Sequence, residues 1–239
     1  MKPCPGSVPI DGASRRRRRH RGFALAAALA LVPVPAAAAD AVPVPEGYGD
    51  AMSWYERAAR AGNPRAQYYL GVIHWRGLRG AKDRKLAADW FETAAGQGHA
   101  AAQFSLGLAY QLGEGRPRDP AQAARWYAAA ARAGHAEAAY NLAGLHDQGS
   151  GVERNPAQAA ILYRQAAESG LARAQYNLGL LYQAGQGVPK DRAWAWVWLK
   201  RAADQGYAPA RPALEALAKA MTGAERSRAE KALAEKPRS

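Results

Sequence analysis

A 36-residue period runs through most of the chain, and it constrains the fold more than any other feature of the sequence. Four kinds of residue recur at this spacing in five copies: an aromatic residue or leucine, a glycine, an alanine and a leucine. The four series are Tyr55, Phe91, Tyr127, Tyr163 and Leu199; Gly62, Gly98, Gly134, Gly170 and Gly206; Ala66, Ala102, Ala138, Ala174 and Ala210; and Leu70, Leu106, Leu142, Leu178 and Leu214. A period of this length, held without insertion or deletion, is typical of a repeat protein.

Each copy predicts two short helices joined by a turn. In the first copy, apolar residues recur over residues 51–59 with the three-to-four-residue spacing of an amphipathic helix, and Gly62 follows where a helix end favours a left-handed backbone. A second helix is expected over residues 66–73, where Gly71 permits the close approach of a neighbouring helix. Alanine is plentiful, whereas valine, isoleucine and threonine are sparse, so the composition also favours helix.

Glycine-rich turns and capping residues separate the copies. Side chains that can cap the next helix again lie 36 residues apart, at Asp83, Asp119, Asn155 and Asp191. Near the C-terminus, Thr222 and Glu225 have the spacing of a capping box. The sequence therefore predicts an all-α solenoid of about five helix–turn–helix repeats over residues 48–221, closed by a capping helix and tail at 222–239. The expected repeats are 48–83, 84–119, 120–155, 156–191 and 192–221.

The repeat also carries a family resemblance. The pattern Ala-Arg-Trp-Tyr-x-x-Ala-Ala-x-x-Gly-x-x-x-Ala-x-Tyr-Asn-Leu-x-x-Leu-x-x-x-Gly-x-Gly-Val, read from Ala124 to Val152, resembles the Sel-one-like repeat (SLR), a relative of the tetratricopeptide repeat. The resemblance covers roughly residues 47–221. It implies a right-handed solenoid whose first helices line a concave binding face, and an adaptor or scaffold role, in bacteria often in the envelope or outside the cell.

The first 39 residues predict an export signal. Arginines at positions 15–19 and 21 precede a short apolar core, and small residues lead to a cleavage site that we place after Ala39. An apolar core of about ten residues is too short to span a membrane, which takes about 20, so a retained anchor is the less favoured interpretation. We expect the general secretory route, with the twin-arginine route as the alternative. Residues 40–47 form an extended leader in this interpretation, and the mature chain is periplasmic or secreted, with no transmembrane segment.

Export lowers the net positive charge of the mature chain and changes the kind of partner that this charge favours. Residues 1–39 carry a net charge of +6, so the rest of the chain carries about +7 of the total of +13. In an exported protein this charge favours an acidic protein partner or an anionic envelope surface over nucleic acid. The only cysteine, Cys4, lies in the signal, and the repeats therefore lack the disulfides found in some exported relatives of the family.

No catalytic, metal or cofactor site is predicted. His74 and His146 take the place of tyrosines in other copies, His99 and His135 follow the glycine that ends the first helix, and no metal-binding spacing links them. The serines are not part of a nucleophile elbow. A cell-wall or β-lactam-directed hydrolase is thus the least favoured function.

Tryptophans fall into two groups. One group occupies a single repeat position and is expected to pack between helices: Trp54, Trp90, Trp126 and Trp198, with Leu162 in the fourth copy. Trp194 and Trp196 break this pattern. They are candidates either for a specific contact or for docking of the C-terminal cap.

The outward positions of the first helices vary in charge and size between copies, as Ile161 and Val197 illustrate. They are either a solvated surface or a partner-binding face, and we take the second interpretation. The predicted binding residues are Arg57, Arg60, Asp89, Glu92, Arg125, Arg132, Arg164, Gln165, Glu168, Trp196, Lys200 and Arg201. The sequence thus predicts an exported scaffold or adaptor that binds a protein or peptide; a module that binds anionic cell-wall polymers is the alternative.

Overall fold

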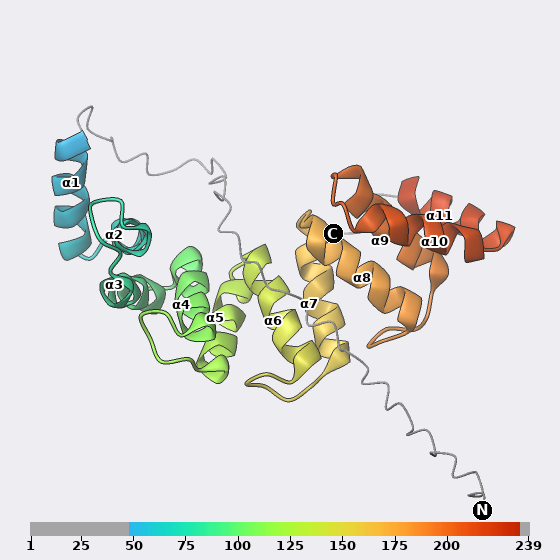
Figure 1. Ribbon diagram of the computed structural model, residues 1–239, viewed down its shortest axis with the longest axis horizontal. Coiled ribbons are helices and arrows are strands. Elements are labelled where there is room, and N and C mark those ends of the chain that lie inside the picture. Colours follow the sequence, from blue (N-terminus) through green and yellow to red (C-terminus); the bar gives the residue numbers. More distant parts are fainter. Residues whose placement is uncertain (1–47, 235–239) are drawn as a thin grey trace, which may run out of the picture. The chain divides into compact units, whose positions relative to one another are not determined.

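The computed structural model describes residues 48–234, and regular structure in this part of the chain is entirely helical (Figure 1). The first helices of the repeats are α1 (Tyr48–Arg60), α3 (Arg84–Gly96), α5 (Pro120–Arg132), α7 (Pro156–Glu168) and α9 (Arg192–Asp204). The second helices are α2 (Pro64–Arg76), α4 (Ala100–Leu112), α6 (Ala136–Gln148), α8 (Ala172–Ala184) and α10 (Ala210–Ala220), and α11 (Gly223–Ala234) follows. Each helix from α1 to α9 packs on the next, which confirms the predicted solenoid. The predicted signal and leader lie outside the described residues.

The predicted capping residues begin the first helices. The Asp83 carboxylate accepts the Leu86 N–H at 2.9 Å, and Asp191 accepts the N–H groups of Ala193 and Trp194 at 2.9 and 3.1 Å. These bonds satisfy donors that lack a partner within the first helical turn. At the other end, each first helix is followed by its C-cap residue and then by a glycine of positive φ, such as Gly98 at +85°.

Histidines cap two of the second helices, a role that the sequence analysis missed. The Nδ1 atoms of His99 and His135 accept the N–H three residues further on, at 3.2 and 3.3 Å. Both imidazoles stack on an aromatic ring of the preceding repeat, Tyr68 and Phe104. Burial lowers the pKa of His99, and lowers that of His135 to about 4. Asn63 caps α2 from the same repeat position, which was the available signal.

Small residues set the distance between repeats. A methyl group added to Gly107 would lie 2.8 Å from the Tyr127 ring, closer than carbon atoms pack. The role predicted for Gly71 is confirmed, because a methyl group there would overlap Phe91. In the last repeat the equivalent residue is Glu215, which is exposed. A further helix therefore cannot pack on α10 in the same way.

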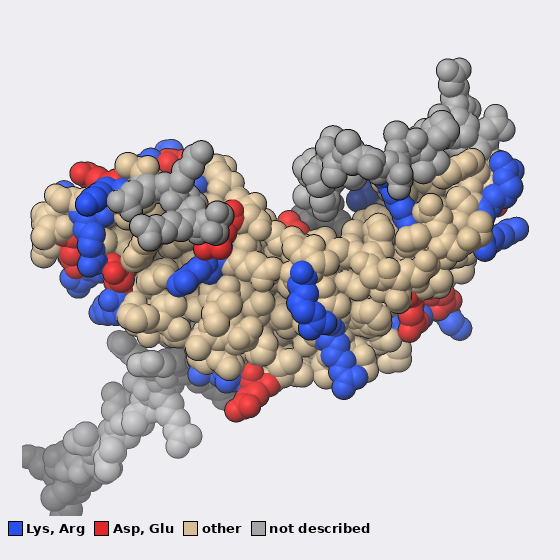
Figure 2. Space-filling view, turned by 180° about the vertical axis from the view of Figure 1, so that it is seen from behind, with Lys and Arg blue, Asp and Glu red and all other residues tan. Residues whose placement is uncertain are grey.

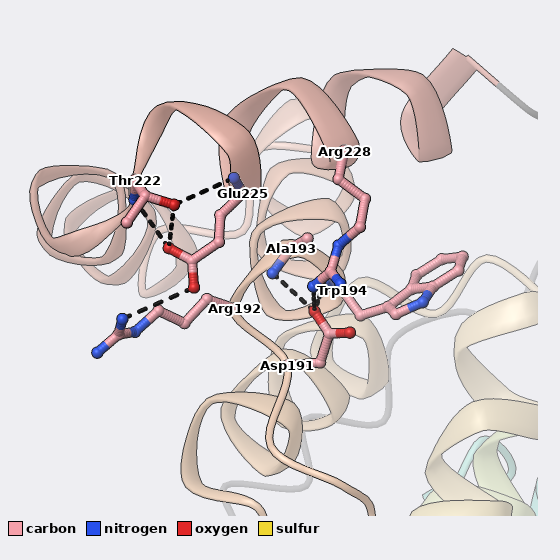
Figure 3. Close-up of polar contacts among 7 residues, drawn as sticks. All are labelled: Asp191, Arg192, Ala193, Trp194, Thr222, Glu225 and Arg228. Atoms are coloured by element: carbon pink, nitrogen blue, oxygen red, sulfur yellow. Dashed lines mark hydrogen bonds and ion pairs between the residues drawn. The ribbon is translucent and has the colours of Figure 1, made fainter.

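Instead, α11 folds back onto α9. The predicted capping box is confirmed: Glu225 accepts the Thr222 N–H at 2.8 Å, and the Thr222 hydroxyl accepts the Glu225 N–H at 3.2 Å (Figure 3). An ion pair of 2.6 Å joins Arg228 to Asp191, the capping residue of α9. Trp196 is half-buried and packs in the apolar cluster formed by α9, α10 and α11. Of the two roles predicted for Trp196, the structure thus shows contact with the C-terminal cap.

Candidate partner-binding face

The outward side of the first helices forms the surface on which the sequence places the partner. We call it the first-helix face. It contains one position of each first helix from α3 to α9, namely Asp89, Arg125, Ile161 and Val197, which are 36 residues apart. It also contains the exposed residues that lie one and two helical turns after each of these. The first three of the four equivalent positions are exposed, and Ile161 is 59% exposed. The predicted residues on α3, α5 and α7 therefore do share one side of the solenoid helices.

Ion pairs occupy the first-helix face in the first two repeats. Arg116, from the loop after α4, binds Asp89 at 2.8 Å and Glu92 at 2.6 Å. Arg79, from the loop after α2, binds Glu56 at 2.9 Å. Asp89 and Glu92, two of the three predicted acidic residues, are thus already paired within the chain. The repeat pattern does not predict this pairing, because Arg116 stands where the next two copies have Val152 and Val188.

In the fifth repeat, α11 covers the same face. Val197 is 0% exposed, and Ala193 one turn earlier is buried, although the equivalent residues of α5 and α7 are exposed. The prediction that Val197 faces outward is therefore wrong, because Ala229 of α11 packs in the same cluster.

The basic residues at the end of α9 make contacts within that helix. Lys200 binds Asp204 at 2.6 Å. The Arg201 guanidinium lies 4.8 Å from the centre of the Trp198 ring, and burial lowers the pKa of Arg201. These two predicted residues thus remain on the surface, but their charged groups are engaged locally.

Repeats three and four leave the first-helix face open. Arg125 and Arg132 of α5 are exposed and form no ion pair with the residues that the structure describes. Arg164 of α7 is exposed and donates to the Tyr182 hydroxyl at 2.6 Å, a neutral group that leaves its charge unbalanced. Glu168 is exposed at the end of α7. The open part of the face thus carries mainly positive charge.

One predicted binding residue has a structural role. The Gln165 amide donates to the Ala131 carbonyl at 2.7 Å, which joins α7 to the end of α5.

On α1, Arg57 and Arg60 are exposed and lack an ion pair with any described residue. Figure 2 shows that Lys, Arg, Asp and Glu are scattered over the side in view and do not gather into one broad basic patch.

The repeated tryptophans pack between helices, as predicted. Trp198 is buried in the central apolar cluster, and Leu162 of the fourth copy is buried in the same cluster. Trp90 and Trp126 pack against the apolar clusters of the preceding repeats. These side chains therefore stabilise the solenoid.

Comparison with known proteins identifies the repeat. The family model described as Sel1 repeat matches residues 42–63, 64–99, 100–135, 136–171 and 172–207. The chain belongs to the Sel1 repeat family. The model places each repeat boundary before a second helix, whereas we place it before a first helix, and the period is the same.

Solved Sel1 repeat structures show the same fold. A protective antigen of uropathogenic Escherichia coli strains with an SLR fold is 37% identical, with a TM-score of 0.71 over 77% of this chain and 40% of that chain. A Sel1 repeat protein from Oxalobacter formigenes is 36% identical, with a TM-score of 0.66 over 70% of this chain and 69% of that chain. This chain thus spans less than half of the first relative. A search of curated proteins gave no match.

Sel1 repeat proteins are generally scaffolds for protein–protein interaction and typically have no enzymatic activity. Within residues 48–234, no three or more His, Cys, Asp or Glu side chains are grouped so that they could hold a metal ion. No helix in this part of the chain is both long and apolar enough to cross a membrane.

Proposed function

We propose that this Sel1 repeat protein is an exported scaffold that binds a protein or peptide on the first-helix face of repeats three and four. The observation that carries the proposal is the pair Arg125 and Arg132, both exposed on α5 and both without an ion-pair partner in the described part of the chain. In the neighbouring repeats, internal ion pairs or α11 occupy the same face.

Physical chemistry favours an acidic partner at this place. A guanidinium group can form two parallel hydrogen bonds with a carboxylate, and neither α5 arginine uses this capacity within the described chain. The third and fourth repeats are fully built from packed helices, so binding requires little ordering of the scaffold itself. Exposed like charges also accelerate the approach of an oppositely charged partner.

A charge-reversal variant tests the binding face. We expect Arg125→Glu with Arg132→Glu to abolish capture of the partner from envelope extracts, while the fold is retained. The matched control is Arg211→Glu with Lys219→Glu, which makes the same change in charge at exposed positions of α10. Proteins captured equally by both variants would show that this face is not the binding site. Co-sedimentation of the wild type with purified sacculi, unchanged by the first variant, would favour the cell-wall alternative.

Export has a separate test. We expect the protein in the periplasmic or extracellular fraction, with Asp40 as the first residue in mass spectrometry. An intact N-terminus in the cytoplasmic fraction would contradict export and leave the test of the binding face unaffected.

A further inference from the structure

The packing of α11 on α9 shows how a helix can lie on the first-helix face. The interface is small and apolar: Ala229 is fully buried against the cluster that contains Val197, while Ala232 and Leu233 are partly buried. Its edge is polar, because Arg228 binds Asp191 at 2.6 Å. A short helix with small apolar residues on one side and charges at its flank therefore fits this face.

A second apolar surface adjoins α11 and is not covered by it. Trp194, in the first turn of α9, is 39% exposed, and its ring stacks on that of Tyr182 with 6.4 Å between centroids. Tyr182 in turn accepts a hydrogen bond from Arg164, one turn after Ile161 on α7. In Figure 3 the indole of Trp194 points away from Glu225, on the far side of Asp191. We call these four residues, Ile161, Arg164, Tyr182 and Trp194, the Trp194 surface.

The repeat does not require these side chains. At the position of Ile161 the other copies have Ser53, Asp89, Arg125 and Val197, and Val197 is the one that α11 covers. At the position of Trp194 the second to fourth copies have Leu86, Gln122 and Gln158. Exposed apolar side chains that lie next to one another often mark an interaction site. The Trp194 surface thus carries exposed apolar side chains, Ile161 and Trp194, that the repeat itself does not specify.

We propose that the Trp194 surface binds an acidic amphipathic helix of the partner protein, laid beside α11. The proposal rests on the proposed function and deepens it, because it names the chemistry of the partner and the place where the partner is anchored. The apolar side of the helix packs on Ile161 and Trp194. Carboxylates on its flank bind the Arg164 guanidinium, whose only partner among the described residues is the neutral Tyr182 hydroxyl and ring.

The charges around the surface favour an acidic ligand over a basic one. Arg164 lies on one side of Tyr182 and Trp194, and Arg228 lies beside Asp191, which precedes Trp194 by three residues. The carboxylate of Asp191 is already bound by Arg228 and by two backbone N–H groups. An incoming carboxylate therefore meets unbalanced positive charge and aromatic rings, which is the combination found at many binding hot spots.

The test uses labelled synthetic helices. One peptide has leucine on one side and glutamate on both flanks; a second replaces glutamate by lysine, and a third replaces leucine by alanine. We expect only the first to bind, by fluorescence anisotropy, with an affinity that falls as salt is added. Trp194→Gln, Ile161→Ser and Arg164→Ala should each weaken binding by about tenfold. Each introduces a residue that another copy has at the same position, Gln158, Ser53 and Ala128, so the fold should be retained.

Leu112→Gln provides the control, because Leu112 is also an exposed apolar residue and Gln148 occupies its position in the next copy. Equal loss of binding in Leu112→Gln and Trp194→Gln would overturn the proposal, as would equal binding of the lysine peptide, no binding of any peptide, or binding to anionic lipid vesicles in place of the peptide. A native partner lost with Arg125→Glu/Arg132→Glu but kept with Trp194→Gln would overturn this assignment and leave the proposed function standing.

Discussion

At the scale of single residues, buried glutamines show how the repeat holds polar groups in its core. Gln67 and Gln175 each donate to a carbonyl of the preceding first helix at 3.1 Å, and each accepts a side-chain N–H of a glutamine 30 residues later at 2.7 Å. Gln103 donates in the same way, but its Oε1 has no partner among the described residues, because the donor position is Ala133. A buried acceptor without a donor reduces stability.

Restoring that donor should stabilise the protein. In Ala133→Gln the new side chain can reach Gln103 as Gln97 reaches Gln67, and we expect a gain of about 1 kcal/mol in the free energy of unfolding. Urea denaturation measures it. The control is Ala133→Ser, the residue found in the next copy at Ser169. If the two variants have the same stability, the unpaired oxygen does not limit the native state.

The histidine caps make stability depend on pH. Burial disfavours the protonated imidazoles, so the pKa of His135 falls from 6.5 to about 4 on folding and that of His99 also falls. The unfolded chain then binds more protons between these values, and stability is complete above about pH 6.5 and declines as the pH falls towards about 4. In His99→Asn/His135→Asn, which copies the Asn63 cap, thermal melts across this range should lose most of that slope. An unchanged slope would assign the pH dependence to other groups.

At the scale of the helices, the loops between repeats are fixed by backbone contact as well as by turn conformation. Gly151 has a φ of +70°, and a Cβ added to it would overlap the main chain at Pro120, the first residue of α5. Gly115 and Gly187 meet the start of α3 and α7 in the same way. Each of these loops therefore packs with its main chain directly against the first residue of the first helix in the same repeat.

Glycines of positive φ are thus of two kinds, those whose added Cβ would meet the main chain of a neighbouring helix and those whose added Cβ would meet nothing. Gly98 also has a positive φ, but nothing lies within 4 Å of an added Cβ, so Gly98→Ala should cost only the backbone strain of about 1–2 kcal/mol. Gly151→Ala should cost about 2 kcal/mol more, because the main chain must also move. Chemical denaturation of both variants gives the difference. Equal losses would mean that the loop yields without disturbing α5.

At the scale of the whole solenoid, stability is expected to be local, because each repeat contacts mainly its neighbours. The C-terminal repeat then depends on α11, which covers Val197 and Ala193. Removal of residues 222–239 exposes both side chains to water.

We expect this truncation to lower hydrogen-exchange protection in α9 and α10 and to leave α3–α5 nearly unchanged. Removal of residues 235–239 alone is the control. A uniform loss of protection along the chain would show that the solenoid unfolds as one cooperative unit.

The sequence predicts what depends on local chemistry and on the period. The caps at Asp83 and Asp191, the Thr222–Glu225 box and the small residue at Gly71 all follow from the residue type at its place in the repeat. Contacts made by residues that depart from the repeat are harder to predict. Arg116 reaches α3 from the next loop, and α11 turns back onto α9, because of side-chain packing that no local pattern describes. The repeat thus indicates which helices carry the candidate face, whereas which part of that face is open follows only from the structure.

The exposed Glu215 has a consequence for how such a protein can change in length. Because this side chain blocks the surface on which a sixth repeat would pack, new copies cannot be added beyond α10. A duplicated unit such as residues 120–155 carries both of its own matching surfaces and can be inserted between existing copies. At this end the solenoid can therefore lengthen only by insertion between copies, and a unit inserted between the third and fourth repeats would move α11 and the Trp194 surface further from Arg125 by the span of one repeat. In this way the reach between two points of contact on a partner can be tuned in discrete steps while both ends of the protein stay unchanged.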